Sequence, residues 1–327
     1  MENKCSCVIS EEIVNGIKVV YLENDLIRLS LLVGKGCELY EIIYKPLNMD
    51  ILLKSKGGLE QYKGRELSKE RLTWYSELFT GGWMDVLPDR GTYGDVYLVQ
   101  KNSGIAATVP WDYEILEQYE DKITIKCFVI LPLMPLYVEK TITIVNHQSK
   151  IYVNEYVKNV GNLLASFTWT QHATFGGEFL DEYVKLTIPC KKVFKAIEYE
   201  QAKGKNPEDY ECPIENVKMS DETVYNLLTV KPNSFDEELF VTVRDLEKPY
   251  FNLYNEKKGV GVRFDWDYKA FPYLRYWYKN SKDLYTIGIE PSNYYFDGFD
   301  NCIEKQTCFQ LEPTKGLSTW YTCELYT

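Results

Sequence analysis

Apolar and polar residues alternate along most of the chain with the two-residue period of half-buried β-strands. The alternation is clearest over residues 122–130, 138–145 and 150–157, which short polar turns separate. Three consecutive strands joined in this way form an antiparallel meander. Further segments of the same kind cover residues 25–33, 38–44, 261–267, 284–290 and 319–325. The pattern therefore predicts an all-β, antiparallel fold.

One segment follows the period of a helix instead. Its apolar residues fall on a single helical face, and the pair Gly81 and Gly82 follows it, as glycines commonly do where helices end. The residues of the apolar face are Leu72, Tyr75, Leu78 and Phe79. The sequence thus predicts one short helix over residues 68–79.

Nothing in the chain marks a boundary between domains. A length of 327 residues suits either two ordinary domains or one large all-β domain. The sequence contains no linker rich in proline, serine or glycine, no abrupt change in composition and no internal repeat, so we expect a single domain over residues 1–327. The longest polar interruption, residues 198–221, is predicted to be a surface loop or lid.

The charge balance argues against two classes of partner. The chain has 37 basic and 48 acidic residues, a formal net charge of −11, and no basic stripe. Such a field repels nucleic acid backbones and anionic lipid surfaces. Residues 1–12 lack the apolar core of a secretion signal, and the most apolar stretch, residues 127–138, is too short to span a bilayer. We expect a cytoplasmic protein that binds neither nucleic acid nor membranes.

The cysteines indicate neither disulfides nor a metal site. Their number, nine, is odd, and they form no Cys-x-x-Cys pair and have no histidine nearby at metal-ligand spacing. Free thiols in a reducing compartment explain them, and no metal is expected.

Histidine is so rare in this chain that it narrows the search for chemistry. Only His147 and His172 are present, and histidine is the side chain that ordinarily titrates near neutral pH. His147 lies between two alternating runs, in a polar segment typical of a hairpin tip. His172 follows a segment rich in threonine and tryptophan and precedes Gly176 and Gly177, where a strand ends and the backbone turns. His172 is therefore the stronger candidate, although a structural histidine would fit the same pattern.

Three other segments carry candidate residues, each with an ordinary alternative. Glu290 ends an apolar, strand-like run, and it faces either a cleft or solvent. Arg275 lies among five aromatic residues that include Trp277, which suits either a sugar-binding surface or a packed strand. Trp83 and Asp85 follow the two glycines that end the predicted helix, in either a ligand loop or a simple helix exit.

Taken together, these motifs resemble those of the aldose 1-epimerase, or galactose mutarotase-like, superfamily. The similar segments are residues 81–88, 169–176, 271–277 and 288–292, in this order, and the resemblance extends from residue 32 to residue 320. It implies one large β-sandwich with an open sugar-binding cleft, and an enzyme that interconverts the α and β anomers of an aldose. It also implies that His172 is the general acid and Glu290 the general base.

This chemistry suits the residue types. Opening a hemiacetal needs one proton delivered to the ring oxygen and one removed from the anomeric hydroxyl, so an imidazolium and a carboxylate suffice without a metal or nucleotide cofactor. We expect Arg275, Trp277, Trp83 and Asp85 to line the cleft around a small-molecule sugar. The protein is expected to act as a monomer or homodimer.

One departure from the family pattern keeps other functions open. Many members have a second histidine that helps to hold the sugar, where this chain has Ser103. We expect the shorter serine side chain to form a hydrogen bond with a sugar hydroxyl in its place. A non-catalytic carbohydrate-binding or sugar-sensing protein could keep the cleft without the proton transfers. A glycoside-cleaving enzyme would need two carboxylates around one bond, and Asp85 with Glu290 is the pair that the sequence offers.

Overall fold

The computed structural model of the protein describes residues 7–68, 75–98, 103–195, 211–218, 224–233, 236–295 and 297–327. Within these residues the strands form two large sheets and two small ones, and all strand pairs are antiparallel. The alternation of apolar and polar residues predicted this all-β, antiparallel class, which the structure confirms.

The larger sheet has twelve strands. In spatial order they are β1 (Val8–Val14), β2 (Ile17–Glu23), β3 (Ile27–Leu32), β4 (Glu38–Tyr44), β6 (Trp83–Val86), β14 (Thr170–Phe175), β24 (Tyr285–Ser292), β23 (Tyr273–Asn280), β20 (Glu237–Val243), β16 (Lys192–Lys195) and β17 (Glu211–Pro213), with β5 (Met49–Asp50) paired to β4. Neighbours such as β6, β14 and β24 are far apart in sequence, so this sheet joins distant parts of the chain.

The second large sheet has eight strands. In spatial order they are β15 (Val184–Thr187), β21 (Tyr250–Asn255), β22 (Val260–Trp266), β26 (Gly316–Tyr326), β12 (Lys150–Asn159), β11 (Leu136–Val145), β10 (Lys122–Ile130) and β9 (Asp112–Gln118). The small sheets contain β25 (Phe309–Leu311), β13 (Ala165–Phe167), β7 (Gly91–Tyr93) and β8 (Val96–Leu98), and β18 (Val217–Lys218) with β19 (Val224–Tyr225). The predicted meander is present as β10, β11 and β12, joined by antiparallel pairing.

Helical structure is sparse in the described part of the chain. Its one α-helix is α2 (Phe299–Glu304), and the 3₁₀ helices are η1 (Lys45–Leu47), η2 (Gly58–Tyr62), η3 (Tyr75–Leu78) and η5 (Ile105–Ala107). Of the helix predicted over residues 68–79, residues 69–74 lie outside the described residues, and its described end is η3. No described helix has both the length and the apolar character needed to cross a membrane.

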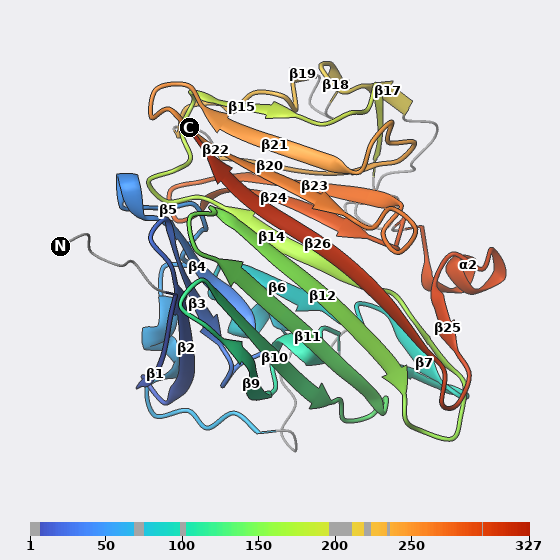
Figure 1. The fold of residues 1–327 in the computed structure, drawn as a ribbon. Helices are drawn as coiled ribbons and strands as arrows, with labels where there is room; N and C mark the ends of the chain where they lie inside the picture. The colour runs from blue at the N-terminus through green and yellow to red at the C-terminus, as the bar shows by residue number, and fades with distance from the viewer. Residues whose placement is uncertain are drawn as a thin grey trace.

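The two large sheets pack face to face around the main hydrophobic core. In Figure 1, β26, β12 and β11 cross in front of β14 and β6. Trp83 of β6 lies against Phe264 of β22 and Tyr321 of β26. The centroid of its ring is 4.5 Å from that of Phe264 and 4.6 Å from that of Tyr321. Residues from Cys7 to Leu325 contribute to this core. The molecule is therefore the β-sandwich that the resemblance implies.

His147 lies at the hairpin tip between β11 and β12, as predicted. Its backbone has a positive φ of 61°, which marks the turn. The ring is exposed, and Nδ1 lies 2.7 Å from Oδ2 of Asp25. The backbone N–H of His147 also donates a hydrogen bond to Oδ1 of Asp25 at 2.8 Å, so Asp25 holds His147 at the surface.

Candidate active site

His172, Glu290 and Arg275 lie in one row across three neighbouring strands. Arg275 of β23 is paired with Glu290 of β24, and the register between β24 and β14 places His172 opposite Glu290. Side chains directly opposite each other project to the same face of a sheet. This face of the twelve-stranded sheet points away from the core, and we call it the site face.

The imidazole and the carboxylate of this row are close to each other. Nε2 of His172 lies 3.4 Å from Oε1 of Glu290, and the two side chains are 12% and 2% exposed. Phe79 and Trp277 stand beside the imidazole, with ring centroids 5.8 and 6.1 Å from it. The pair is therefore partly open to solvent on the side of His172 and is bordered by two aromatic rings.

Gly288 makes room for this arrangement. It occupies the site face two residues before Glu290, opposite Trp277. A Cβ atom at Gly288 would lie 2.7 Å from Oε1 of Glu290 and 3.3 Å from the Trp277 ring. Any larger residue here would displace the carboxylate, so the absence of a side chain positions Glu290.

The surroundings of Glu290 make its ionisation difficult. Burial raises the pKa of this carboxyl group, while the nearby positive charges of His172 and Arg275 oppose the rise and the Asp89 carboxylate adds to it. The net effect is a pKa above the ordinary glutamate value. A carboxylate that binds a proton more readily than usual is suited to act as a base near neutral pH.

Asp89 is a residue of the candidate site that the sequence did not reveal. It follows β6, is buried, and forms an ion pair with the Arg275 guanidinium. Its carboxylate also accepts a hydrogen bond from Oγ1 of Thr170 at 3.3 Å and lies 3.1 Å from Nη1 of Arg90. Burial alone would raise the pKa of Asp89, but Arg275 and Arg90 hold it below its ordinary value. A negatively charged carboxylate therefore lies behind Arg275, next to His172 and Glu290.

Ser103 supports Asp89. Its side chain is buried, and the hydroxyl group donates a hydrogen bond to the backbone oxygen of Asp89 at 2.6 Å. The sequence led us to expect this hydroxyl to hold a sugar. In the structure, the Ser103 hydroxyl instead donates its hydrogen bond to the backbone of the loop that carries Asp89.

Trp277 is oriented by a second acidic residue. The indole Nε1 donates a hydrogen bond to Oε1 of Glu238 at 3.0 Å, across the pairing of β20 with β23. Lys279 lies 3.4 Å from the other oxygen of Glu238. The ring is half-buried, so one part of it is fixed and another part is accessible beside His172.

Trp83 and Asp85 do not join the site, contrary to expectation. They belong to β6, where Met84 is the residue paired with His172. Successive side chains of a strand point to opposite faces, so the residues on either side of Met84 point into the core. Trp83 and Asp85 are both fully buried there. Asp85 and Glu290 consequently lie on opposite faces of the sheet, and they cannot flank one glycosidic bond.

The core residue Asp85 belongs to a buried polar network. Its carboxylate forms an ion pair with Lys140 and accepts hydrogen bonds from Trp169 Nε1 at 3.0 Å and Gln171 Nε2 at 2.6 Å. Gln171 Nε2 also donates to Glu155 at 2.8 Å. This network connects β6 and β14 of one sheet with β11 and β12 of the other.

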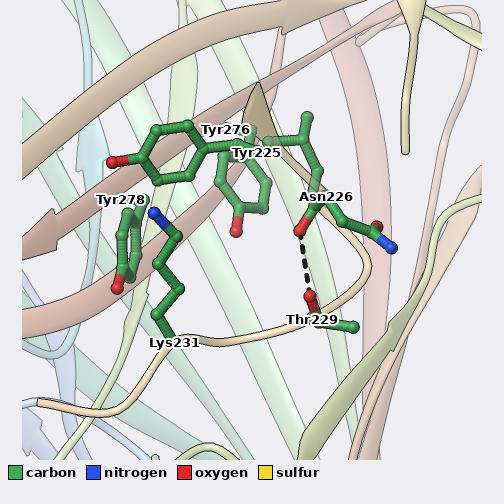
Figure 2. Close-up of a pocket in the computed structure, with 7 residues that line it drawn as sticks. Tyr225, Asn226, Thr229, Lys231, Tyr276 and Tyr278 are labelled. Carbon is green, nitrogen blue, oxygen red and sulfur yellow. Dashed lines mark hydrogen bonds between the residues drawn. The ribbon is translucent and has the colours of Figure 1, made fainter. Parts of the chain in front are cut away.

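A small cavity lies on the core side of β23, behind the site face. Figure 2 shows the lysine amino group of Lys231 next to Tyr225 and Tyr278, and Nζ lies 3.8 Å from the centre of the Tyr225 ring. The cavity has a volume of about 30 Å³. This is room for water and far less than a sugar needs. The described residues contain no group of three or more histidine, cysteine or acidic side chains that could hold a metal ion.

The fold is that of the galactose mutarotase-like superfamily. A "putative aldose 1-epimerase" from Klebsiella pneumoniae matches with a TM-score of 0.72 and 16% identity, over 97% of this chain and 83% of that one. A galactose mutarotase-like protein from Clostridium acetobutylicum matches with a TM-score of 0.65 and 12% identity, over 98% of each chain. A galactose mutarotase related enzyme from Lactobacillus acidophilus matches with a TM-score of 0.60 and 13% identity, over 94% of this chain and 97% of that one.

Within this fold, the chain belongs to the DUF4432 family, a domain of unknown function whose model matches residues 131–325. The matched region contains His172, Arg275 and Glu290, whereas Asp89 and Ser103 precede it. No curated protein sequence matches the chain. The comparisons thus define the fold and the family, and the chemistry has to be inferred from the site.

Proposed function

We propose that the protein is an aldose 1-epimerase, which interconverts the α and β anomers of a free aldose by acid–base opening of the ring. The observation that supports this most is the 3.4 Å separation of His172 Nε2 from Glu290 Oε1 beside aromatic rings on the site face. The substrate of this reaction is a small neutral or weakly charged sugar.

The geometry suits the two proton transfers of this reaction. The ring oxygen and the anomeric hydroxyl are bonded to the same carbon, so the acid and the base must lie close to each other and reach the sugar from one side. His172 protonates the ring oxygen while Glu290 takes the proton of the anomeric hydroxyl, and the ring opens to the aldehyde. Rotation about the C1–C2 bond and reversal of both transfers give the other anomer.

The neighbouring residues support this chemistry without exchanging protons. Trp277 and Phe79 offer apolar surface to the C–H face of the sugar. Arg275 is held by Asp89 and places a positive charge next to Glu290, which favours the ionised carboxylate that the reaction needs. Burial counteracts this charge, and the balance sets the basicity of Glu290.

Sugar binding without catalysis is the second candidate function. It is favoured by Ser103, because its hydroxyl group donates to the backbone oxygen of Asp89 and leaves one sugar-holding group fewer than in many superfamily members. The two functions share a cleft and differ in the proton transfers. The exchange of anomeric signals, followed by NMR for free hexoses, pentoses and 6-phosphorylated sugars, separates them. A catalyst accelerates exchange for at least one sugar, whereas a binding protein broadens sugar signals without accelerating exchange.

The fit of Gly288 provides a steric test of the site. In Gly288→Ala, the new methyl group displaces the Glu290 carboxylate, and we expect the anomerisation rate to fall roughly tenfold to a hundredfold. The matched control is Gly57→Ala, where the nearest atom to an added Cβ is Gln61 Cβ at an ordinary 3.6 Å. Polarimetry of a freshly dissolved pure anomer measures both rates. Full activity in Gly288→Ala would refute the placement of Glu290 as the base.

The pH dependence tests the charge next to Glu290. Protonated Glu290 cannot accept a proton, so activity is present above its pKa and is lost as the pH falls through it. Because burial raises this pKa above the ordinary 4.5, the acid limb of kcat/KM should have its midpoint above that value. Arg275→Gln removes a charge that lowers the pKa and leaves Asp89, which raises it, so the midpoint should move to higher pH.

Arg275→Lys is the control for this shift, since it keeps a positive charge beside Glu290. Its acid limb should lie closer to that of the parent protein than the limb of Arg275→Gln does. Initial rates of mutarotation measured from pH 4 to 8, with the buffer-catalysed rate subtracted, give the three midpoints. Equal midpoints in all three proteins would show that Arg275 does not influence the base.

A further inference from the structure

A second groove lies on the outer face of the eight-stranded sheet. It covers β11, β12 and β26, which are drawn in front in Figure 1, and has a volume of about 440 Å³. Sites for small molecules have volumes in this range. We call it the outer groove, and it is lined by Glu139, Thr141, Asn154, Glu155, Tyr156, Ser318, Thr319 and Trp320.

The outer groove is separated from the candidate active site by both sheets. The side chain of Glu155 belongs to the buried network between the sheets. Its neighbours Asn154 and Tyr156 therefore project to the opposite side, toward solvent. His172 and Glu290 lie on the far face of the other sheet, so a ligand in the outer groove does not occupy the site of the proposed reaction.

The pairing of strands sets two aromatic residues of the groove on neighbouring strands and in neighbouring rows. Tyr156 is paired with Glu139 on one side and Ser318 on the other, and Asn154 is paired with Trp320 in the next row. Neighbouring rows on one face are separated by two residues, or roughly 7 Å. The shorter side chains of Asn154 and Ser318 lie between the two rings, which leaves the groove hollow.

One of the two rings is held in place by packing and the other is exposed. A Cβ atom at Gly316 would lie 2.6 Å from the hydroxyl oxygen of Tyr156 and 2.8 Å from two of its ring carbons. The Tyr156 ring therefore lies across β26 directly on the backbone of Gly316, which only glycine permits. Trp320 is 43% exposed, an unusually large exposure for a tryptophan.

The polar groups of the groove are neutral with one exception. Within the described residues, the side chains of Thr141, Asn154, Ser318 and Trp320 form no hydrogen bond. Glu139 is the single charged side chain that points outward, and it accepts a hydrogen bond from Tyr137 at 2.8 Å. Hydroxyl, amide and indole groups next to aromatic rings suit a ligand with many hydroxyl groups. The carboxylate and the net charge of −11 disfavour a phosphate-containing ligand.

We propose that the outer groove binds a neutral oligosaccharide. The C–H faces of its sugar rings stack on Trp320 and Tyr156, and its hydroxyl groups form hydrogen bonds with Asn154, Ser318 and Thr141. This binding is independent of the proposed anomerisation, because the two sites lie on opposite sides of the sandwich.

The experiment is a titration of the full-length protein with maltotriose, cellotriose, xylotriose and mannotriose, followed by saturation-transfer NMR and tryptophan fluorescence. At least one trisaccharide should bind, and Trp320→Ala should weaken its binding about tenfold. Tyr119→Ala removes another exposed ring, in the turn between β9 and β10, and should leave binding unchanged. Trp320→Ala should also retain the parent rate of anomerisation, and His172→Asn should retain trisaccharide binding.

Three results would overturn the proposal. The first is that no trisaccharide binds in a manner that depends on Trp320. The second is that binding is lost in His172→Asn and kept in Trp320→Ala, which assigns the binding to the active-site cleft. The third is that Trp320→Ala changes self-association of the chain and not sugar binding, which assigns the groove to a second copy. The first outcome leaves the anomerisation assay unaffected, so failure of this proposal is distinguishable from failure of the proposed function.

Discussion

Replacing His172 with Asn, or Glu290 with Gln, is expected to lower the catalysed anomerisation of the substrate sugar at least about a hundredfold. Asparagine can donate a hydrogen bond but cannot deliver a proton to the ring oxygen. Glutamine has nearly the same shape as glutamate but cannot accept the proton of the anomeric hydroxyl. Since the two groups act in one step, the double variant should be little slower than either single variant. Exchange spectroscopy on the anomeric protons measures all three rates.

The histidine that lies at the surface provides the matched control. His147→Asn makes the same chemical change at the hairpin tip, and it should leave the rate unchanged because His147 is 76% exposed and far from Glu290 in the fold. Sugar binding, measured by line broadening, should survive in His172→Asn and Glu290→Gln. Variants that equilibrate sugars as fast as the parent would disprove the acid–base assignment. A parent protein that binds sugars and accelerates none would establish the binding function instead.

Stability should change in the opposite direction to activity in Glu290→Gln. The folded protein holds the Glu290 proton more tightly than the unfolded chain does, because burial raises the pKa of this group. Its contribution to stability is therefore lost as the pH rises through that pKa. The neutral amide avoids this loss, so the variant should be at least as stable as the parent at neutral pH. Functional sites commonly show this opposition between stability and activity.

Much of the fold follows from local patterns. The segment predicted over residues 122–130 coincides with β10, and the segments over 38–44 and 150–157 match β4 and most of β12. In these strands one face is buried in the core and the other faces solvent, so apolar and polar residues alternate along the sequence. The order of strands in the larger sheet has no such signal, because β6, β14 and β24 are neighbours only through long connections.

The candidate site was predictable only in part, because it too depends on the pairing of strands that are distant in sequence. His172 stood out through the rarity of histidine, and Glu290 because it ends an apolar run in the sequence, although β24 continues to Ser292. Their contact depends on the pairing of β14 with β24. Asp85 was misplaced because the face on which a side chain lies depends on its position within a strand. The pair of glycines before Trp83 suggested that Asp85 lies in a loop, where the alternation of strand faces does not determine the direction of a side chain. Asp89 was missed because its partner, Arg275, is distant in sequence.

The misplaced Asp85 leads to the largest expected effect on stability. Lys140 is fully buried, forms an ion pair with Asp85, and lies 3.6 Å from Oε1 of Glu155. Lys140→Met leaves two adjacent carboxyl groups in the core without their cation. Removing one partner of a buried ion pair costs about 3–5 kcal/mol. For a protein of this size the Tm should fall on the order of 10 °C. Thermal unfolding followed by circular dichroism measures the change.

A second substitution and a change of pH separate loss of charge from loss of packing. Asp85→Asn in the Lys140→Met background removes one of the carboxylates left without a cation and should restore part of the stability, whereas Asp85→Asn alone should destabilise the protein.

Burial and the Asp85 charge raise the pKa of Glu155 well above its ordinary value, and Lys140 opposes this rise. In Lys140→Met, the penalty for ionised Glu155 is present above its pKa and is lost as the pH falls, so the deficit in Tm should shrink in acid. Lys56→Met, at an exposed ion pair with Asp283, should leave the Tm unchanged at every pH. A Lys140→Met protein with the parent Tm would show that the two carboxyl groups are already neutral in the core.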